Sequence, residues 1–358
     1  MVPAGTAGGR YRPEACANAG RRVVEASTRN NCRVARRSVR VLPILPAAPA
    51  RAFWGARVGT QLTGTMPPWD MGAQAQFERG TGKRASLIHW GAPWQACTPQ
   101  CHRYEFDTKA ADNARRHGAI SLYDWAPYSE PDHGDAQLTL DAISRGDFDG
   151  LIRGFAAEVG DWGHVLFLRL AWEMNGNFFP WGAGVNGNKP ATFVRAWRHV
   201  HDVFASAGAR NVVWVWCPNV DPRHDWAPFS SVYPGDAYVD WTCLDGYNSG
   251  TNPRGHHDGW HTFDEIYRRS YDELSKLAPS KPMMIGEVAS TDWGGSKAGW
   301  IRDMFAKLRD YPRIRGLSWT NDPFDGMDWP VESSAAAGDA FRTGIRSAYF
   351  SAGAARGG

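Results

Sequence analysis

Two glutamates stand close beyond the ends of apolar runs at separate places in the chain. Glu173 follows the run 165–168 and sits between a tryptophan and an asparagine, and Glu287 ends the run 283–286. A carboxyl group at the end of a hydrophobic strand is poorly solvated, so it holds its proton more tightly. A protonated acid paired with an ionised carboxylate is the arrangement that hydrolyses glycosidic bonds. The two residues therefore predict sugar-bond hydrolysis.

Eight short apolar runs, which alternate with amphipathic stretches, must position these glutamates. Strands this apolar are covered on both faces, as parallel strands are. The expected strands are 57–61, 86–90, 119–123, 164–170, 211–216, 241–247, 282–287 and 314–319. The expected helices are 71–79, 107–117, 148–159, 191–207, 263–277, 296–310 and 338–350. This alternation predicts an α/β fold, a single-domain (β/α)8 TIM barrel, rather than a doubly wound sheet with a Gly-rich phosphate turn.

Polar and aromatic residues gather where the expected strands end. In TIM barrels the chemistry takes place at the carboxyl ends of the strands. The residues found there are His89, Asp124, Glu173, Asn175, Trp216, Asn219, Asp245, Tyr247, Glu287, Trp319 and Asn321. The set holds no lysine for a Schiff base and no His-rich group. We therefore expect a sugar site that needs no cofactor and no metal ion.

The chain is rich in tryptophan, with 18 residues of this type in 358. Some of these rings are expected to fill the core, since indole side chains bury a large apolar area. The others would suit a cleft that stacks on the flat apolar faces of sugar rings. A neutral polysaccharide or oligosaccharide is therefore the expected partner, and we expect the protein to act as a monomer.

The net charge of +3 hides two unlike parts of the chain. Residues 1–51 hold ten arginines and two acids, whereas the rest holds 30 basic and 35 acidic residues. The body thus has no basic stripe for a phosphate backbone, and nucleic acid is not an expected ligand. No apolar run approaches the roughly 20 residues that a membrane helix needs, so no membrane span is expected.

The basic segment 1–51 has no useful periodicity and is expected to lack regular structure or to be processed. The stretch 35–40 with its paired arginines, followed by the apolar stretch 41–46 and the small residues 48–50, resembles an export signal. A start codon set too far upstream would explain the segment equally well. On the first interpretation the protein is extracellular; a cytoplasmic location stays open. The catalytic domain is expected over residues 52–352.

The six cysteines are too few to staple a chain of this size. Cys97 and Cys101 lie four positions apart in a loop and could close a small disulfide in an exported protein. Cys243 falls on an expected strand and Cys217 directly follows one, and both are predicted to be buried free thiols.

The sequence around Glu173 resembles a known family. The stretch 169–176, Arg-Leu-Ala-Trp-Glu-Met-Asn-Gly, with Phe-Phe-Pro-Trp-Gly at 178–182, resembles the strand-four signature of glycoside hydrolase family 26, which includes β-mannanases. The stretches 213–219, 233–248 and 281–287 resemble its strands five, six and seven. The resemblance covers about residues 54–350. It implies a (β/α)8 glycosidase with the acid on strand four and the nucleophile on strand seven.

The resemblance also implies roles for particular residues. Glu173 would be the general acid/base and Glu287 the nucleophile of a retaining hydrolysis. Tyr247 would hydrogen-bond the nucleophile, Trp319 would stack under the sugar being cleaved, and Arg169 would brace the acid's strand. The other expected substrate-binding residues are Trp172, Asn175, Trp181 and Trp216.

One departure from the family pattern concerns the substrate. Its mannanases usually carry a histidine that contacts the sugar immediately before the acid, and Trp172 stands there in this chain. We expect an endo-acting enzyme on β-1,4-mannan, with xylan or a β-glucan as the alternative substrate. A non-hydrolytic carbohydrate-binding barrel is the remaining alternative, in which Glu173 would only pair with Arg169 and Glu287 would only cap a helix.

Overall fold

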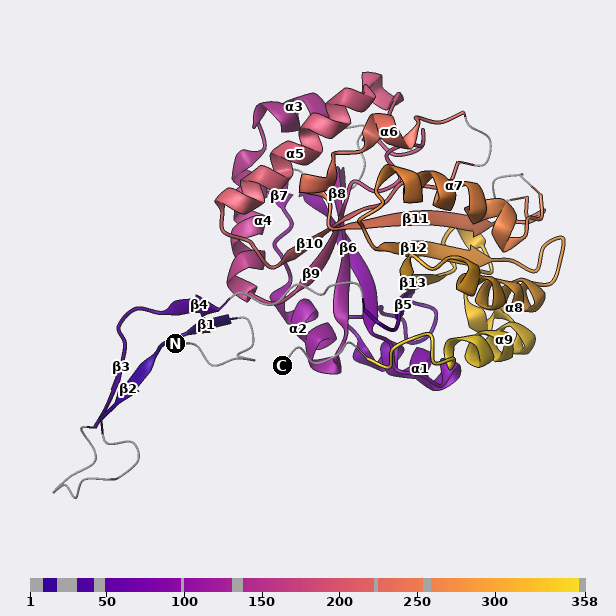
Figure 1. The fold of residues 1–358 in the computed structure, drawn as a ribbon, viewed down its shortest axis with the longest axis horizontal. Helices are drawn as coiled ribbons and strands as arrows, with labels where there is room; N and C mark the ends of the chain where they lie inside the picture. The colour runs from indigo at the N-terminus through magenta and orange to yellow at the C-terminus, as the bar shows by residue number, and fades with distance from the viewer. Residues whose placement is uncertain are drawn as a thin grey trace.

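The computed structural model describes residues 9–17, 31–41, 49–97, 100–130, 138–221, 225–253 and 259–353. Within these residues a closed barrel of eight parallel strands is surrounded by helices (Figure 1). The barrel strands are β5 (Phe53–Val58), β6 (Leu87–Cys97), β8 (Ile120–Glu130), β9 (Leu166–Leu170), β10 (Val212–Trp216), β11 (Trp241–Asn248), β12 (Met283–Ser290) and β13 (Ile314–Asn321). They pair in chain order, and β5 closes the ring by pairing with both β6 and β13. The (β/α)8 fold that the strand pattern predicts is confirmed.

Nine α-helices form the outer layer of the described part of the chain. They are α1 (Met71–Thr81), α2 (Thr108–His117), α3 (Leu140–Arg145), α4 (Asp149–Trp162), α5 (Pro190–Ser206), α6 (Phe229–Val232), α7 (Phe263–Leu277), α8 (Lys297–Lys307) and α9 (Ala335–Ile345). Side-chain caps fix where several begin; Thr262 and Glu265, for example, form a reciprocal capping box at the start of α7. None of the helices in the described ranges is long and apolar enough to cross a membrane.

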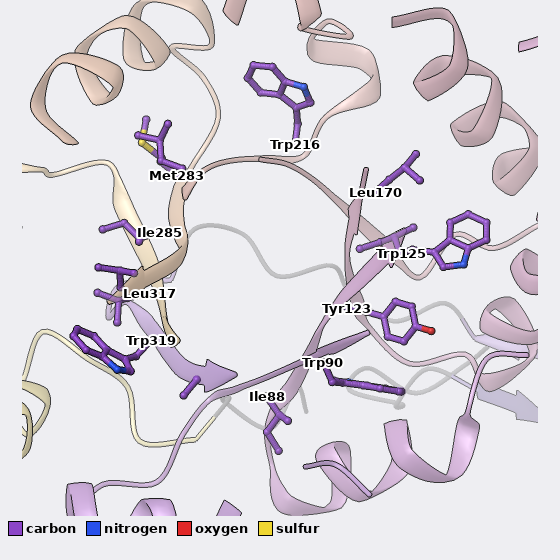
Figure 2. Packing of buried hydrophobic residues seen from close by; sticks show 14 of the residues in the cluster. Ile88, Trp90, Tyr123, Trp125, Leu170, Trp216, Met283, Ile285, Leu317 and Trp319 are labelled. Atoms are coloured by element: carbon purple, nitrogen blue, oxygen red, sulfur yellow. The ribbon is translucent and has the colours of Figure 1, made fainter. Parts of the chain in front are cut away.

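The core has two layers that follow from the alternation of side chains along each strand. One set of residues fills the inside of the barrel, among them Phe53, Leu122 and Phe167. The other set points outward and packs under the helices, as Figure 2 shows for Tyr123 and Leu317. The inner layer is apolar near the amino ends of the strands and becomes polar toward their carboxyl ends. At the mouth, the charged side chains of Arg169, Asp124 and Asp245 meet inside the barrel.

The first barrel strand is earlier in the chain than predicted. We expected it at 57–61, whereas β5 spans Phe53–Val58. Trp54 and Ala56 face the helices and are buried, while Phe53 faces the barrel interior. The strand therefore begins immediately after the basic segment.

The basic segment also contains regular structure that was not expected. Among its described residues, β1 (Gly9–Tyr11) pairs with β4 (Val39–Val41) and β2 (Glu14–Cys16) pairs with β3 (Cys32–Val34), both antiparallel. A disulfide joins Cys16 to Cys32. Both strand pairs lie to one side of the barrel (Figure 1). The disulfide and the hydrogen bonds between paired strands give this stretch regular structure, although its amino-acid composition does not indicate any strand.

Candidate active site

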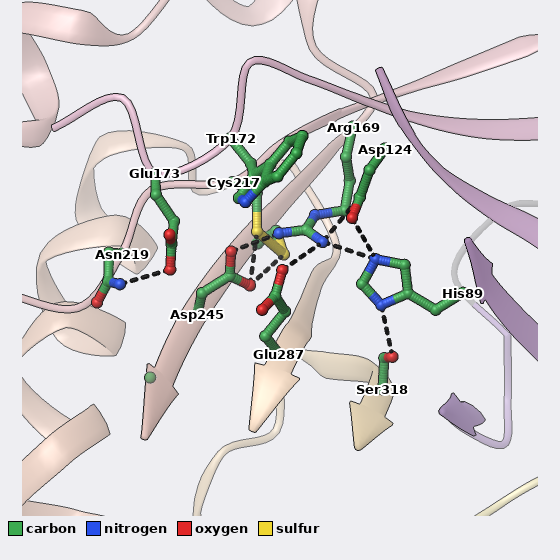
Figure 3. Close-up of polar contacts among 12 residues, drawn as sticks. His89, Asp124, Arg169, Trp172, Glu173, Cys217, Asn219, Asp245, Glu287 and Ser318 are labelled. Carbon is green, nitrogen blue, oxygen red and sulfur yellow. Dashed lines mark hydrogen bonds and ion pairs between the residues drawn. A yellow bond between two sulfur atoms is a disulfide. The ribbon is translucent and has the colours of Figure 1, made fainter. Parts of the chain in front are cut away.

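A buried arginine organises the mouth of the barrel. Arg169 is the last inward-facing residue of β9 and is fully buried. Its Nη1 donates to Oδ1 of Asp124 at 2.8 Å and to Oε1 of Glu287 at 3.0 Å, and its Nη2 donates to Oδ2 of Asp245 (Figure 3). Although burial opposes it, these carboxylates raise the pKa of Arg169, so the side chain stays charged. One guanidinium thus collects three carboxylates from three other strands.

Glu287 reaches this cluster because β12 carries a bulge. The pairing of β12 with β11 shifts at Gly286, so that Ile285 lies opposite Leu244 and Glu287 lies opposite Asp245. Without the extra residue, Glu287 would face the helices as Ile285 does, because side chains two positions apart share a face. A Cβ at Gly286 would lie 2.4 Å from Cys243 Sγ, so only glycine fits there.

A tyrosine holds the other side of Glu287. The hydroxyl of Tyr247, on β11, donates to Oε2 of Glu287 and lies 3.0 Å from Oγ1 of Thr320. Burial and the neighbouring charge of Glu287 raise the pKa of Tyr247 well above its ordinary value. The phenol therefore remains neutral and keeps its proton for donation. Arg169 and Tyr247 together fix the orientation of the Glu287 carboxylate.

Glu173 occupies a strained turn just beyond β9. Its φ is 53° and that of Ala171 is 43°, in the left-handed region that residues other than glycine seldom adopt. The N–H of Glu173 donates to the carbonyl of Cys217 at 2.7 Å, and Asn219 Nδ2 donates to Oε1 of its carboxylate. Such strain persists where surrounding contacts enforce it, and it is most often found at functional sites.

Glu173 is held in its acid form. Burial raises its pKa to about 8, and the nearby negative charge of Glu287 acts in the same direction. Arg169 and the hydrogen bond from Asn219 oppose the shift. A carboxyl group with this pKa carries a proton near neutral pH and can donate it, as the sequence predicts for this position.

Two further acids complete the cluster. Asp124 accepts from Arg169 and lies 2.8 Å from Nε2 of His89, whose Nδ1 is 3.0 Å from Ser318 Oγ. Burial alone would raise the pKa of Asp124, but Arg169 and His89 lower it. For Asp245, burial and the carboxylates around it raise the pKa well above its ordinary value, against the effect of Arg169. Asp124 is therefore stabilised as an anion, whereas Asp245, like Glu173, holds a proton more tightly than a free carboxyl group does.

Three side chains at the mouth, those of His89, Asp124 and Glu287, are of types that bind metal ions, and the guanidinium of Arg169 contacts two of them. Ligand atoms of His89, Asp124 and Glu287 lie within 4.8 Å of one another. Arg169 Nη1 donates to both carboxylates of this group. The positive charge at this point is therefore that of the guanidinium.

The structure brings together part of the predicted set of site residues. Glu173, Glu287, Arg169 and Tyr247 share one cluster of side chains, and the half-buried ring of Trp172 lies 5.5 Å from the guanidinium carbon of Arg169. Arg169 braces the carboxylate of Glu287 rather than the strand of the acid as expected. The two glutamates, 114 positions apart in the chain, thus face one site at the barrel mouth (Figure 3).

Asn175 and Trp181 support the loop after β9. Asn175 is buried, and its side chain makes two hydrogen bonds to the backbone of Asn219, at 2.8 and 2.9 Å. Trp181 is buried, stacks on Phe179 and donates its indole N–H to the carbonyl of Trp172. Both residues therefore position neighbouring residues, and neither presents its side chain to the open mouth as we had expected.

Trp216 and Trp319 lie outside the mouth, contrary to expectation. Trp216 packs against Phe229 and Tyr233 under the helices. Trp319 is fully buried, contacts Phe341 and points away from the barrel axis (Figure 2). Each ring sits on a strand position that alternates to the outer face.

The cysteines of β10 and β11 also differ from expectation. Cys217 and Cys243 are joined by a disulfide rather than being free thiols, and Cys217 Sγ lies 3.1 Å from Oδ1 of Asp245. The disulfide expected between Cys97 and Cys101 is present. The Cys217–Cys243 link therefore lies directly against the acid cluster.

The chain is similar in sequence to proteins of a known glycoside hydrolase family. Residues 155–283 match the model of glycosyl hydrolase family 26, and this range contains Arg169, Glu173 and Asp245. The chain belongs to glycosyl hydrolase family 26. The range ends just before Glu287, which the bulge of β12 places opposite Asp245 and in contact with Arg169.

Two curated proteins are similar to this family 26 chain. Endoglucanase H of Acetivibrio thermocellus is 31% identical over 294 residues, covering 81% of this chain and 30% of that protein. A mannan endo-1,4-beta-mannosidase of Caldalkalibacillus mannanilyticus is 28% identical over 165 residues, covering 44% of this chain and 28% of that protein. The chain thus matches less than a third of the length of either relative.

Solved structures of family 26 share the fold. An endo-beta-1,4-mannanase of Cellulomonas fimi superposes with a TM-score of 0.62 at 16% identity, covering 84% of this chain and 72% of that one. The family 26 domain of an endo-beta-mannanase/endo-beta-glucanase from Prevotella bryantii gives a TM-score of 0.57 at 16% identity, covering 84% and 90%. At this identity the likeness establishes the barrel and not the substrate.

Proposed function

We propose that this family 26 barrel is a retaining, endo-acting β-glycanase, with Glu287 as the nucleophile and Glu173 as the acid/base. The observation that carries the proposal is a carboxyl group with its pKa raised to about 8 near a carboxylate that accepts hydrogen bonds from Arg169 and Tyr247. These are the two protonation states that retaining hydrolysis requires at neutral pH.

The first step forms a glycosyl–enzyme. A carboxylate oxygen of Glu287 attacks the anomeric carbon, and the bond to the leaving oxygen breaks as Glu173 transfers its proton to that oxygen. Arg169 and Tyr247 orient the nucleophile, and Asn219 orients the acid. Loss of negative charge from Glu287 on ester formation removes one cause of the raised pKa of Glu173.

The second step releases the sugar. Glu173, now ionised and less disfavoured in that form, takes a proton from water as the water oxygen bonds to the anomeric carbon. The bond to Glu287 breaks and its carboxylate is regenerated. Two displacements at the same carbon return the β configuration.

We propose a β-glucan as the substrate. Trp172 stands where the family's mannanases usually carry the sugar-contacting histidine, and an indole offers one donor and no acceptor. Glucose and mannose differ in the orientation of a single hydroxyl, so a change in hydrogen-bonding groups beside the acid bears directly on that choice. The relative that covers 81% of the chain is named an endoglucanase, which supports the same substrate class.

β-1,4-mannan is the second candidate. The mannosidase relative and the Cellulomonas fimi mannanase favour it. Mixed-linkage β-glucan, galactomannan and xylan, assayed side by side for reducing-sugar release, separate the candidates. We expect the highest kcat/KM on the glucan. A higher value on galactomannan would replace that assignment, and polysaccharide binding without any release would favour the non-hydrolytic alternative.

Variants of the two glutamates test the mechanism in the same assay. Glu287→Gln should abolish release from every polysaccharide while the protein remains folded. Glu173→Ala should lose activity on polysaccharides but keep cleavage of aryl glycosides whose leaving groups need no protonation. Substantial polysaccharide hydrolysis by Glu287→Gln would refute its assignment as nucleophile.

We also propose that the protein is exported. Three disulfides join the cysteines of the described residues, and such links persist in oxidising compartments. N-terminal sequencing of protein recovered from culture medium tests this. Protein found only inside cells, with its cysteines reduced, would contradict export.

A further inference from the structure

A second arginine lies at the barrel mouth and is held quite differently from Arg169. Arg57 is in β5, where it pairs in register with Thr320 of β13. Thr320 faces inward and contacts the Tyr247 hydroxyl, and register partners on neighbouring strands share a face. The adjacent residues Ala56 and Val58 are buried under the helices. The side chain of Arg57 therefore points into the mouth.

The donors of Arg57 have no hydrogen-bond acceptor among the described residues. Its Nη1 lies 3.6 Å from Oδ2 of Asp124 and its Nε lies 3.7 Å from Oδ2 of Asp322, both beyond hydrogen-bond distance. Its side chain is 36% exposed, whereas that of Arg169 is 0% exposed and donates to three carboxylates. A guanidinium has five N–H donors in a rigid fork. Those of Arg57 are available to a ligand in the mouth.

The position of Arg57 determines which part of a substrate it can meet. β5 is four strands from β10 in either direction around the barrel. The acid Glu173 follows β9, the neighbour of β10 and three strands from β5, and Asn219, which donates to Glu173, follows β10. A leaving group departs toward the acid. The sugar that is transferred to Glu287, and the unit that precedes it, therefore extend toward the side of β5.

The charges around Arg57 favour a neutral ligand. Asp322 follows β13 and its side chain is 17% exposed, so a carboxylate acceptor stands beside the fork. The negative charges of Asp124, Glu287 and Asp322 raise the pKa of Arg57, although its partial burial opposes this. These three acids would repel an anionic sugar. Two neutral hydroxyls of a sugar could instead accept a hydrogen bond from Arg57 and donate one to Asp322.

We propose that Arg57 and Asp322 form the subsite for the sugar unit that precedes the one being cleaved. Arg57 donates to one hydroxyl of that unit, and Asp322 accepts a hydrogen bond from a neighbouring hydroxyl. This proposal rests on the proposed function, because it takes the direction of the substrate from Glu173 and Glu287. It assigns to β5 a part in specificity that neither catalytic glutamate performs.

Calorimetry with two inhibitors tests the proposal. A glucose-configured iminosugar occupies only the cleaved position, and its β-linked disaccharide also occupies the preceding one. For Arg57→Ala, we expect the dissociation constant of the disaccharide to rise about 10- to 100-fold, the range for a hydrogen bond to a charged group. That of the monosaccharide should change less than about threefold. Asp322→Asn should weaken the disaccharide alone by about tenfold, and Arg57→Lys should fall between Arg57→Ala and the wild type.

The controls separate binding from folding and from hydrolysis. Arg195→Ala removes an exposed arginine of α5 that lies 3.4 Å from Asp141, and both dissociation constants should stay unchanged. Thermal unfolding of each variant checks its fold. Equal weakening of both inhibitors by Arg57→Ala would overturn the proposal, because Arg57 would then act through Glu287 or Asp124. A wild-type chain that binds the disaccharide through Arg57 but releases no sugar would overturn the proposed hydrolysis alone.

Discussion

Arg169 Nη1 donates a 3.0 Å hydrogen bond to Oε1 of Glu287 inside the barrel, where the arginine side chain is 0% exposed. The same guanidinium also binds Asp124 and Asp245. One buried guanidinium therefore links Glu287, the proposed nucleophile, to Asp124 and Asp245.

Replacement of Arg169 should destabilise the protein strongly. Arg169→Met leaves buried carboxylates without a counter-charge, and removal of one partner of a buried pair costs about 3–5 kcal/mol. Urea unfolding at pH 7 measures this. Arg195→Ala, which removes an exposed ion pair, should cost less than about 1 kcal/mol. An Arg169→Met variant as stable as Arg195→Ala would show that the cluster does not need the cation.

Glu173 should set the alkaline limit of activity. Glu173 acts as an acid only when protonated, so kcat/KM for a polysaccharide should fall as pH rises through its pKa of about 8. The hydrogen bond from Asn219 lowers that pKa, so Asn219→Ala should move the limit to higher pH. Aryl glycosides with good leaving groups should lack this limit in kcat/KM. An alkaline limit that is identical for both substrate types would assign it to another group.

Much of this architecture could be predicted from the sequence because it rests on periodicity. The apolar runs indicated the barrel strands, and the parallel topology places their carboxyl ends at one mouth. The sequence places Asp124, Asp245 and Asn219 at strand ends. Only the structure shows that Arg169 binds the two aspartates and that Asn219 donates to Glu173. These contacts join strands far apart in the chain, and no local pattern encodes them.

The wrong placements of Trp216 and Trp319 have a common cause. Trp216 and Trp319 were placed by their nearness to a strand end, whereas the face of a strand residue depends on register. In β13, Ser318 and Thr320 face inward, so Trp319 must face outward. Arg57 was missed because the first strand was expected four residues too late.

The bulge at Gly286 should be essential for aiming Glu287. In Gly286→Ala the new Cβ would lie 2.4 Å from Cys243 Sγ, and such overpacking costs about 1–3 kcal/mol. A shift of about 1 Å in the nucleophile can cost about 100-fold in rate. We expect kcat/KM to fall at least about tenfold. Gly150→Ala is the control, since a Cβ there meets nothing within 4 Å. Full activity of Gly286→Ala would contradict the role of the bulge.

The Cys217–Cys243 disulfide should stabilise the barrel. It spans 26 positions, and closing a loop of that length contributes about 3 kcal/mol. The Cys217→Ser, Cys243→Ser double variant should lose about that much in urea unfolding. The Cys97–Cys101 disulfide closes a loop of only four positions, so the matched double serine variant of these cysteines should lose less stability. Thiols at Cys217 and Cys243 that alkylate in unfolded, unreduced protein would contradict the link.

Trapping the covalent intermediate tests the central claim most directly. A 2-deoxy-2-fluoro glycoside with a good leaving group should form the glycosyl–enzyme faster than water can release it. Mass spectrometry of the intact protein should then show one added glycosyl group, and peptide mapping should place it on Glu287. A label on any other residue, or turnover that yields the inverted product and no adduct, would contradict the assignment of Glu287 as the nucleophile opposite Glu173.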